Sequence, residues 1–242
     1  MPSDLVSVQQ LLRQQRPAEA WTALEPMLRQ EPANLDTLLL AGRIQLALDQ
    51  AQQARTYLTR AAKLAPRSPA AHFLLGFCLY LDNDFTPALT ALLTARQLRS
   101  NDGPTLLYLA LTHEGLADIE SALKLYPEAI RHNSSPEAPL AFARLLFTLQ
   151  RFPEAHTQIK EALRRDPQYR EAFYERARLH LEAAHFAESV ADAEKALTLP
   201  GLPQTERQLH FLLARAYQKL QNEAKARFHR QAFERIPPRL VR

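Results

Sequence analysis

The sequence predicts an all-α protein, for three reasons. Leucine and alanine supply 43 and 38 of the 242 residues. Valine, isoleucine and glycine are scarce, with four, five and five residues, whereas strands favour β-branched residues and hairpin turns need glycine. Small residues also recur with a period of 34 along most of the chain. We therefore expect pairs of helices that stack in chain order, with no sheet.

Composition excludes several other classes of protein. Five scattered glycines form none of the glycine motifs of dinucleotide-binding or P-loop folds. No apolar run approaches ~18 residues, so no membrane span is predicted. The segment Met1-Pro2-Ser3-Asp4 lacks the basic and apolar regions of a signal peptide, which predicts a cytoplasmic protein unless a leader precedes it. The single cysteine, Cys78, excludes an internal disulfide, and its apolar neighbours predict a buried, unreactive thiol.

The 34-residue period is clearest at alanine. Ala54, Ala88 and Ala122 are 34 residues apart, and in a frame that begins at residue 1 they occupy position 20 of successive units. Position 20 is alanine or serine in all seven units, which has a chance probability on the order of 10⁻⁵. Two units need small shifts of the frame. The predicted units are 1–34, 35–68, 69–102, 103–135, 136–169, 170–203 and 207–240.

Each unit has the residue pattern of two antiparallel helices. Small residues at positions 8 and 20 let the two backbones approach, and large apolar residues at positions 4, 7, 11 and 24 fill the space around them. Ser68-Pro69 and Ser135-Pro136 predict an N-cap followed by the first residue of a helix. Pro26 and Pro127 fall inside the second helix of their units, which predicts kinks or early breaks there.

The pattern resembles that of the tetratricopeptide repeat family, over about seven units and almost the full chain. Ala41-Gly42, Leu75-Gly76 and Leu109-Ala110 match positions 7 and 8 of the family motif, and Ala54 and Ala61 match positions 20 and 27. The resemblance implies an α-solenoid, a right-handed superhelix formed by a single repeat domain over residues 1–242. The first and seventh units match less well, as is typical of end repeats.

In this family, positions 2, 5, 9 and 12 of each unit point into a concave groove. The resemblance therefore implies a partner-binding groove that is apolar and aromatic in its middle, with arginines on both sides. The candidate groove residues are Leu39, Arg43, Phe73, Phe77, Tyr80, Leu107, Leu111, Leu140, Arg144, Phe147, Tyr174, Arg178, Phe211 and Arg215. The alternative is that Phe73, Phe77 and Tyr80 pack between adjacent first helices.

The candidate groove predicts the chemistry of its partner. Exposed apolar patches mark interaction sites, and aromatic residues with arginine carry much binding energy. We expect a protein or peptide partner, an amphipathic helix or extended segment that combines apolar and acidic residues. The carboxylate clamp of chaperone-binding relatives is absent, because position 5 is always apolar, position 9 is never asparagine, and position 6 is neither asparagine nor arginine.

No catalytic, cofactor or metal site is predicted. His72 and His210 occupy position 4, and His113 and His180 occupy position 11, which are packing positions of the repeat. No HExxH motif and no catalytic triad spacing are present. We therefore expect a protein that is not an enzyme, with no cofactor and no bound metal.

Charge leaves one alternative function open. The net charge is +4, and residues 122–242 hold 20 basic and 14 acidic residues, against 10 and 12 in residues 1–121. A basic half can attract nucleic acid, so the alternative is a nucleic-acid-associated adaptor that uses the C-terminal units. No nucleic-acid-binding motif accompanies the charge, which favours the protein-interaction scaffold. The sequence leaves the oligomeric state open.

Overall fold

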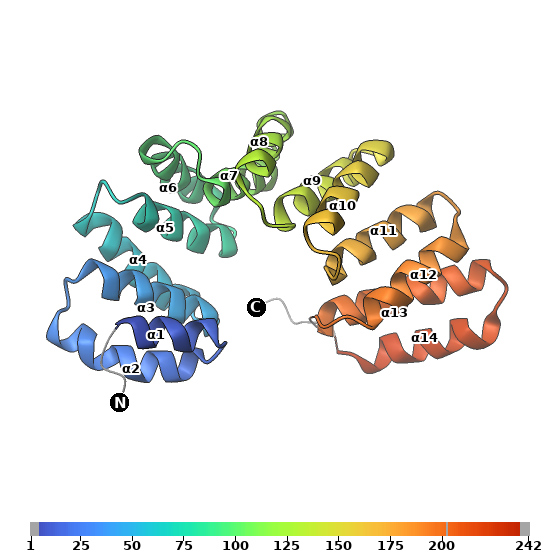
Figure 1. The fold of residues 1–242 in the computed structure, drawn as a ribbon, viewed down its shortest axis with the longest axis horizontal. Coiled ribbons are helices and arrows are strands. Elements are labelled where there is room, and N and C mark those ends of the chain that lie inside the picture. Colours follow the sequence, from blue (N-terminus) through green and yellow to red (C-terminus); the bar gives the residue numbers. More distant parts are fainter. Residues whose placement is uncertain (1–4, 202, 238–242) are drawn as a thin grey trace. The chain divides into compact units, whose positions relative to one another are not determined.

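The computed structural model describes residues 5–201 and 203–237, with side chains omitted for 203 and 204. These residues form fourteen helices and no strand, so the predicted all-α fold is confirmed (Figure 1). The chain divides into two compact units, residues 1–133 and 134–242. The single repeat domain over 1–242 stays a prediction.

The helices form consecutive pairs, in which we call the odd-numbered member helix A and the even-numbered member helix B. The first unit contains α1 (Leu5–Arg13), α2 (Pro17–Gln30), α3 (Leu35–Ala47), α4 (Ala51–Leu64), α5 (Pro69–Leu81), α6 (Phe85–Leu98), α7 (Gly103–Gly115) and α8 (Ile119–His132). The second unit contains α9 (Glu137–Thr148), α10 (Phe152–Arg165), α11 (Arg170–Glu182), α12 (Phe186–Leu197), α13 (Pro203–Lys219) and α14 (Glu223–Arg235).

The small residues at position 20 are fully buried in their helix pairs. All seven are 0% exposed: Ala20, Ala54, Ala88, Ala122, Ala155, Ser189 and Ala226. The one polar member is satisfied, because the Ser189 hydroxyl donates to the carbonyl of Ala177 at 2.8 Å. Each of the first six predicted repeats contains one complete helix pair. The seventh pair starts earlier than predicted, because α13 begins at Pro203, and proline is favoured in a first helical turn.

Every turn from helix A to helix B has the same backbone conformation. Its central residue, at position 15, has a φ of 57–60° in all seven repeats: Gln15, Asp49, Asn83, Ala117, Gln150, Ala184 and Gln221. In α5, for example, the Asn83 N–H donates to the Tyr80 carbonyl and the Asp84 N–H to the Leu79 carbonyl, both at 2.9 Å. These are the two bonds of a Schellman motif, which satisfies carbonyls at the end of helix A.

The structure confirms one predicted helix start and corrects the other. The Ser68 hydroxyl accepts a hydrogen bond from the Ala71 N–H at 3.3 Å, and Pro69 begins α5, as predicted. Ser135-Pro136 differs, because α9 begins one residue later, at Glu137. Here the Ser135 hydroxyl accepts from the Glu137 N–H at 3.2 Å, so the serine closes a short turn before the helix.

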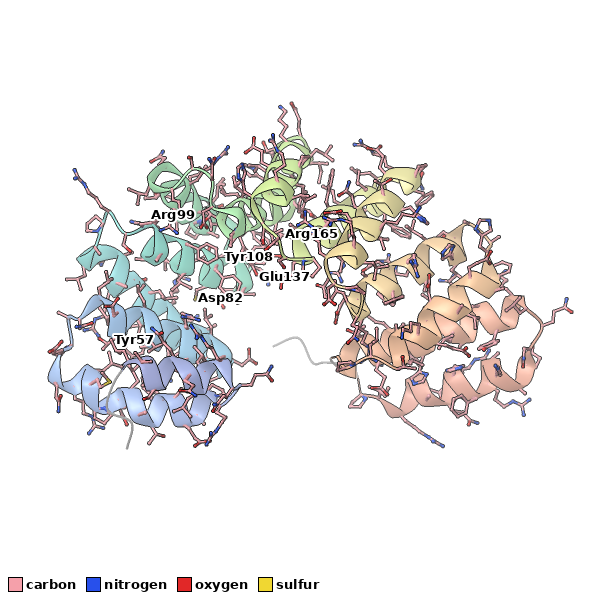
Figure 2. The ribbon with its side chains drawn as sticks, in the orientation of Figure 1. Tyr57, Asp82, Arg99, Tyr108, Glu137 and Arg165 are labelled. Atoms are coloured by element: carbon pink, nitrogen blue, oxygen red, sulfur yellow. The ribbon has the colours of Figure 1, made fainter. Side chains whose placement is uncertain are left out.

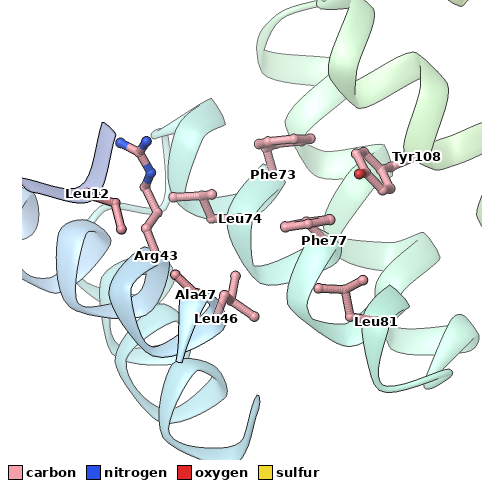
Figure 3. A pocket seen from close by; sticks show the side chains of 9 residues that line it. All are labelled: Leu12, Arg43, Leu46, Ala47, Phe73, Leu74, Phe77, Leu81 and Tyr108. Atoms are coloured by element: carbon pink, nitrogen blue, oxygen red, sulfur yellow. The ribbon is translucent and has the colours of Figure 1, made fainter. Parts of the chain in front are cut away.

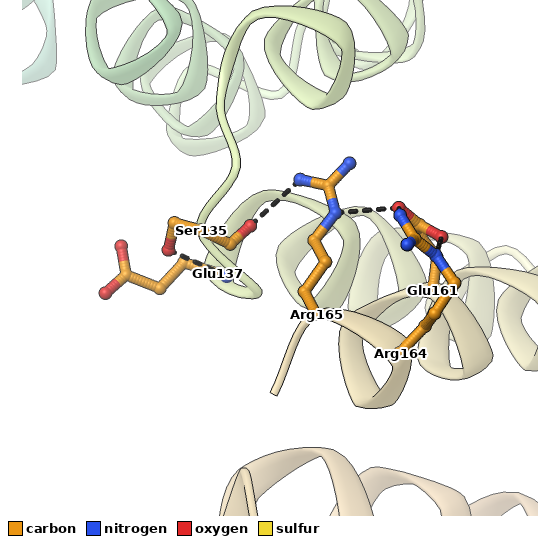
Figure 4. A network of polar contacts seen from close by, with 5 residues as sticks. All are labelled: Ser135, Glu137, Glu161, Arg164 and Arg165. Atoms are coloured by element: carbon orange, nitrogen blue, oxygen red, sulfur yellow. Dashed lines mark hydrogen bonds and ion pairs between the residues drawn. The ribbon is translucent and has the colours of Figure 1, made fainter. Parts of the chain in front are cut away.

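A polar network fixes this turn against α10 (Figure 4). The Arg165 guanidinium donates to the Ser135 carbonyl at 3.0 Å and to the Glu161 carboxylate at 2.7 Å. Arg164 donates two further hydrogen bonds to Glu161. Hydrogen bonds from Arg164 and then Arg165 lower the pKa of Glu161 to about 2, so this carboxylate stays charged at any ordinary pH.

The early breaks expected at Pro26 and Pro127 do not occur. Helix α2 continues to Gln30 and α8 continues to His132. Both prolines are exposed, so their rings displace no packed side chain. Each helix therefore loses the hydrogen bond that the proline nitrogen cannot donate, and it still continues for one further turn.

Stacking places the A helices on one side of each unit. Helix α3 contacts α1 and α5, α5 contacts α7, α9 contacts α11, and α11 contacts α13. No two B helices contact one another to this extent within 5–201 and 203–237. Because neighbouring A helices are closer together than neighbouring B helices, each unit curves toward its A helices. This surface is where the sequence predicts the groove.

Candidate functional site

A hollow of the first unit lies on its A helices, and we call it the aromatic hollow (Figure 3). It has a volume of about 550 Å³ and receives side chains from α1, α3, α5 and α7. Its lining residues are Leu12, Arg43, Leu46, Ala47, Phe73, Leu74, Phe77, Leu81 and Tyr108. The lining is apolar apart from the guanidinium of Arg43 and the hydroxyl of Tyr108.

Tyr108 of α7, whose place in the fold is labelled in Figure 2, contacts three aromatic rings of α5, and Figure 3 shows it beside Phe73 and Phe77. Its ring centroid lies 6.0 Å from that of Phe73, 4.6 Å from that of Phe77 and 5.4 Å from that of Tyr80. The rings therefore pack between α5 and α7, as the alternative interpretation predicted. They are nevertheless only half-buried, and Phe73 and Phe77 also line the hollow. The same aromatic cluster therefore packs between two helices and also lines part of the exposed hollow.

Arg43 lies at the rim of the aromatic hollow, between Leu12 and Leu74 (Figure 3). Its side chain is exposed, and it forms no ion pair with any residue that the structure describes. An exposed guanidinium beside an apolar surface can pair with a carboxylate of a partner at little desolvation cost.

The second unit has a smaller hollow of about 150 Å³ on its A helices. Predicted groove residues Phe147, Tyr174, Arg178, Phe211 and Arg215 all line it. The Arg178 guanidinium carbon lies 4.3 Å from the Phe147 ring centroid and 5.8 Å from that of Tyr174. These cation–π contacts hold Arg178 against the aromatic rings of its own chain.

Glu175 neutralises two of the predicted groove arginines. Glu175 is 4% exposed, and its carboxylate accepts hydrogen bonds from Arg144 at 2.7 Å and from Arg178 at 2.6 Å. Burial lowers the pKa of Arg144, but attraction to Glu175 and the hydrogen bond to it outweigh burial and raise that pKa. These arginines therefore stabilise the contact of α9 with α11, and of the four predicted groove arginines only Arg43 and Arg215 have no ion-pair partner among the described residues.

The remaining predicted groove residues differ in burial. Leu107 and Leu140 are only 3% and 1% exposed, so they lie in the helix packing and offer no surface. Leu39 and Leu111 are half-buried.

Sequence reasoning missed Leu74, Tyr108 and Glu175, which all occupy position 6 of their units. Position 6 is aliphatic in the other units, at Val6, Leu40, Ala141 and Leu212. Tyr108 and Glu175 therefore differ in residue type from the rest of the position, whereas Leu74 does not.

The described residues contain neither a metal-binding cluster nor a membrane-spanning helix. Within the described part of the chain, no cluster of three or more histidine, cysteine, aspartate or glutamate side chains could hold a metal ion. In the same residues, no helix has the length and apolar character needed to cross a membrane. The predicted burial of Cys78 is confirmed, and burial, with a smaller effect of Asp82, raises the pKa of its thiol to about 11.

Two histidines share a hydrogen bond inside the last repeat. The Nδ1 atoms of His210 and His229 are 2.8 Å apart, and the His229 ring stacks on that of Tyr217 at a centroid distance of 5.7 Å. A nitrogen–nitrogen hydrogen bond needs one unprotonated acceptor, so the pair loses it when both rings are charged. Burial is the main cause that lowers the pKa of each histidine. The other charged groups around the pair are Glu206, Arg170, Glu194 and Lys225.

Stability is expected to fall at acid pH partly because of this pair. Both histidines have pKa values below the ordinary 6.5, so unfolding takes up protons as the pH falls below that value. The stability contributed by the two neutral histidines is fully present above the pKa of histidine in the unfolded chain. It is lost as the pH falls through the lower pKa values of the folded protein. Urea unfolding from about pH 7.5 to about pH 5.5 should show a smaller loss of stability for His210→Gln than for the unchanged protein. An equal loss in both would contradict the prediction.

Stacked antiparallel helix pairs with a period near 34 residues define a helical repeat protein of the solenoid class. A tetratricopeptide repeat family model matches residues 39–102 and 140–204, which is more than half of the chain. The chain belongs to the tetratricopeptide repeat family. Repeats of this family generally mediate protein–protein interaction.

Comparison with individual proteins supports the same fold. The DnaJ homolog subfamily C member 7 homolog of Dictyostelium discoideum is 26% identical over 202 residues, which cover 76% of this chain and 37% of that protein. This chain therefore spans well under half of that relative. A chain of the APC/C hetero-tetramer Cut9–Hcn1 superimposes with a TM-score of 0.82 at 15% identity, over 99% of this chain and 48% of that one. A tetratricopeptide repeat protein from Parabacteroides merdae gives a TM-score of 0.72 at 18% identity, over 97% and 92%.

Proposed function

We propose that this protein is a non-catalytic scaffold that binds an apolar, acid-containing segment of a partner protein at the aromatic hollow. One observation carries the proposal: half-buried aromatic rings border a hollow whose rim holds Arg43, which has no ion-pair partner among the described residues. Exposed apolar surface costs about 25 cal/mol per Å² in water, and contact with a partner recovers this free energy. Aromatic residues and arginine are the types that most often dominate binding.

The charge distribution supports an acidic residue in the partner. Arg144 and Arg178 already pair with Glu175, so a carboxylate brought to them would compete with an internal partner. Arg43 has no such competitor among the described residues, and its carboxylate partner would lie beside the apolar hollow. The proposed segment therefore places one or more large apolar side chains in the hollow and a carboxylate against Arg43.

Selection from a displayed library of random 20-residue peptides tests this proposal. Peptides that bind the unchanged chain should lose affinity for Phe77→Ala by about tenfold or more, because the ring lines the hollow. Phe228→Ala is the matched control, since Phe228 is 62% exposed on α14 and lies in the other unit. Far-UV circular dichroism must stay unchanged in both variants. Peptides that bind Phe77→Ala and the unchanged chain equally well would contradict the proposal.

Salt dependence separates the scaffold from a nucleic-acid adaptor. Lys225, Arg227, Arg230 and Arg235 are exposed on α14, so they are candidate cations for contact with a phosphate backbone. Nucleic-acid binding would weaken with a slope of about 0.7–0.9 in log K per phosphate contact per decade of salt. Peptide binding at the aromatic hollow should keep a shallow slope. A steep slope for single-stranded RNA, without any effect of Phe77→Ala, would favour the adaptor.

The cytoplasmic location stays a prediction from the sequence.

A further inference from the structure

Arg170, the first residue of α11, is a buried arginine without a counter-charge. It is 4% exposed, and no hydrogen bond or ion pair joins its side chain to any residue that the structure describes. Its Nε atom is covered and has no acceptor. A guanidinium group keeps its charge at any ordinary pH, and burial of an unpaired charge is strongly unfavourable. Arg170 therefore carries a positive charge that the described part of the chain leaves without a partner.

The equivalent arginine of the last repeat has partners. Arg207 occupies position 1 of the seventh unit, as Arg170 does in the sixth. The Arg207 Nε donates to the Ile236 carbonyl at 3.0 Å, and its guanidinium carbon lies 3.8 Å from the Phe233 ring centroid. Arg170 has neither kind of contact with a described residue. The missing partner is therefore particular to Arg170 and is not a general property of position 1.

The Arg170 side chain lies against Gly201, in the loop before α13. A Cβ atom on Gly201 would lie 2.8 Å from Nη1 of Arg170 and closer still to its Cδ, so a larger residue here would displace the guanidinium. Gly201 is itself exposed. A small solute can therefore approach the guanidinium beside this glycine.

The start of α13 adds positive potential next to Arg170. The helix begins at Pro203, two residues after Gly201. The N–H groups of a first helical turn have no acceptor inside the helix, and the helix dipole is positive at this end, so such ends bind oxyanions. Thr205, in this turn, is 8% exposed, and its hydroxyl forms no hydrogen bond within the described residues. The first turn of α13 thus supplies further donors for an anion.

Glu206 is an acid in the same helical turn. It acts on His210 together with Arg170, so it lies in the same region, but its carboxylate forms no ion pair with Arg170. Its negative charge weakens the attraction of an anion without occupying the guanidinium.

We propose that Arg170 binds a small free oxyanion, of the size and charge of inorganic phosphate, between its guanidinium and the first turn of α13. The Nη1 and Nη2 groups donate hydrogen bonds to the anion, as is usual for arginine with phosphate. Burial limits the ligand to a small ion, because a phosphate group on a peptide would bring its carrier against the surface around Gly201. The anion joins α11 to α13 and thereby stabilises the second unit. This site is separate from the aromatic hollow.

Urea unfolding in phosphate and in chloride at equal ionic strength tests the inference. Phosphate at about 50 mM should raise the urea midpoint of the unchanged chain by ~0.5 M more than that of Arg170→Gln. The comparison uses the difference because phosphate also stabilises proteins by exclusion from their surface, which both chains share. Arg207→Gln is the matched control at the equivalent position, and it should keep the full phosphate effect. Glu206→Gln should enlarge the effect, since it removes a repelling charge.

Titration of His210 followed by NMR locates the anion without any substitution. Burial lowers the pKa of His210, Glu206 raises it, and Arg170 lowers it further. An anion at Arg170 offsets that repulsion, so phosphate should raise the pKa of His210 relative to chloride. His156 of α10 is the control, because Arg170 is not among the charges that act on its pKa. An equal pKa of His210 in phosphate and chloride would overturn the inference.

Three further results would also overturn it. In the first, phosphate stabilises Arg170→Gln as much as the unchanged chain. In the second, phosphate has a specific effect only on Glu206→Gln, which indicates that Glu206 neutralises Arg170 in solution. In the third, the peptide Gly-phosphoserine-Gly stabilises the unchanged chain more than the same concentration of inorganic phosphate, which assigns the site to a phosphorylated partner. Each of these results leaves the proposed function at the aromatic hollow intact.

Discussion

Replacement of both Arg144 and Arg178 by glutamate is expected to destabilise the protein by about 3 kcal/mol, measured by urea unfolding. The reason is Glu175, whose side chain is 5% exposed and accepts hydrogen bonds from both guanidinium groups. Without them, a buried carboxylate loses its counter-charges, and two further carboxylates repel it. The arginines themselves are 49% and 33% exposed, so most of the cost comes from the uncompensated Glu175.

Two further variants check this explanation. A variant that carries Arg144→Ala and Arg178→Ala should also lose stability. The further change Glu175→Leu in that variant should restore much of the loss, because it removes the buried charge. Arg43→Glu should change the free energy of unfolding by less than about 0.5 kcal/mol, since Arg43 is exposed and has no ion pair among the described residues. A double glutamate variant as stable as the unchanged protein would show that Glu175 does not depend on these arginines.

The pairing with Glu175 changes how the predicted groove is interpreted. Four arginines at position 9 suggested a groove with free positive charge on both sides. In the structure, two of them stabilise the contact of α9 with α11, where Glu175 lies on the next A helix after that of Arg144. The sequence could not reveal this, because an ion pair over 31 residues depends on how two A helices stack.

The helix pairing was predictable because it depends on residue size. Position 20 is fully buried in every unit, and close packing there favours a small residue, which is alanine in six units and serine in one. Proline at the helix ends acts through backbone geometry and is equally visible, as the start of α5 at Pro69 shows.

The turns between helices A and B were not predictable in the same way. Position 15 has a positive φ in every repeat, a conformation that favours glycine, yet it is glutamine, aspartate, asparagine or alanine. Each such residue costs about 1 kcal/mol relative to glycine, which the packing of the two helices offsets. Since no residue type is specific to the position, the sequence gives no sign of the motif.

Glycine at the start of α7 is required by a neighbouring backbone. A Cβ atom on Gly103 would lie 2.3 Å from the carbonyl oxygen of His132 and 2.6 Å from its carbonyl carbon. The start of α7 cannot easily shift, because Asp102 caps it by accepting hydrogen bonds from the N–H and hydroxyl of Thr105 at 3.1 and 2.6 Å. The carbonyl of His132 belongs to the last residue of α8, which is also constrained by its helix.

Gly103→Ala is therefore expected to destabilise the protein by about 3 kcal/mol, although alanine favours helices by about 1 kcal/mol over glycine. The matched control is Gly115→Ala at the other end of α7, where the nearest atoms that the new methyl group would meet belong to the half-buried ring of Phe85, at 2.7 Å. A ring can turn aside, whereas the carbonyl of His132 cannot move without displacing the end of α8. Urea unfolding followed by circular dichroism should separate the two variants by at least about 1.5 kcal/mol. Equal stability of both variants would mean that α7 and α8 do not approach as closely at Gly103 as the structure indicates.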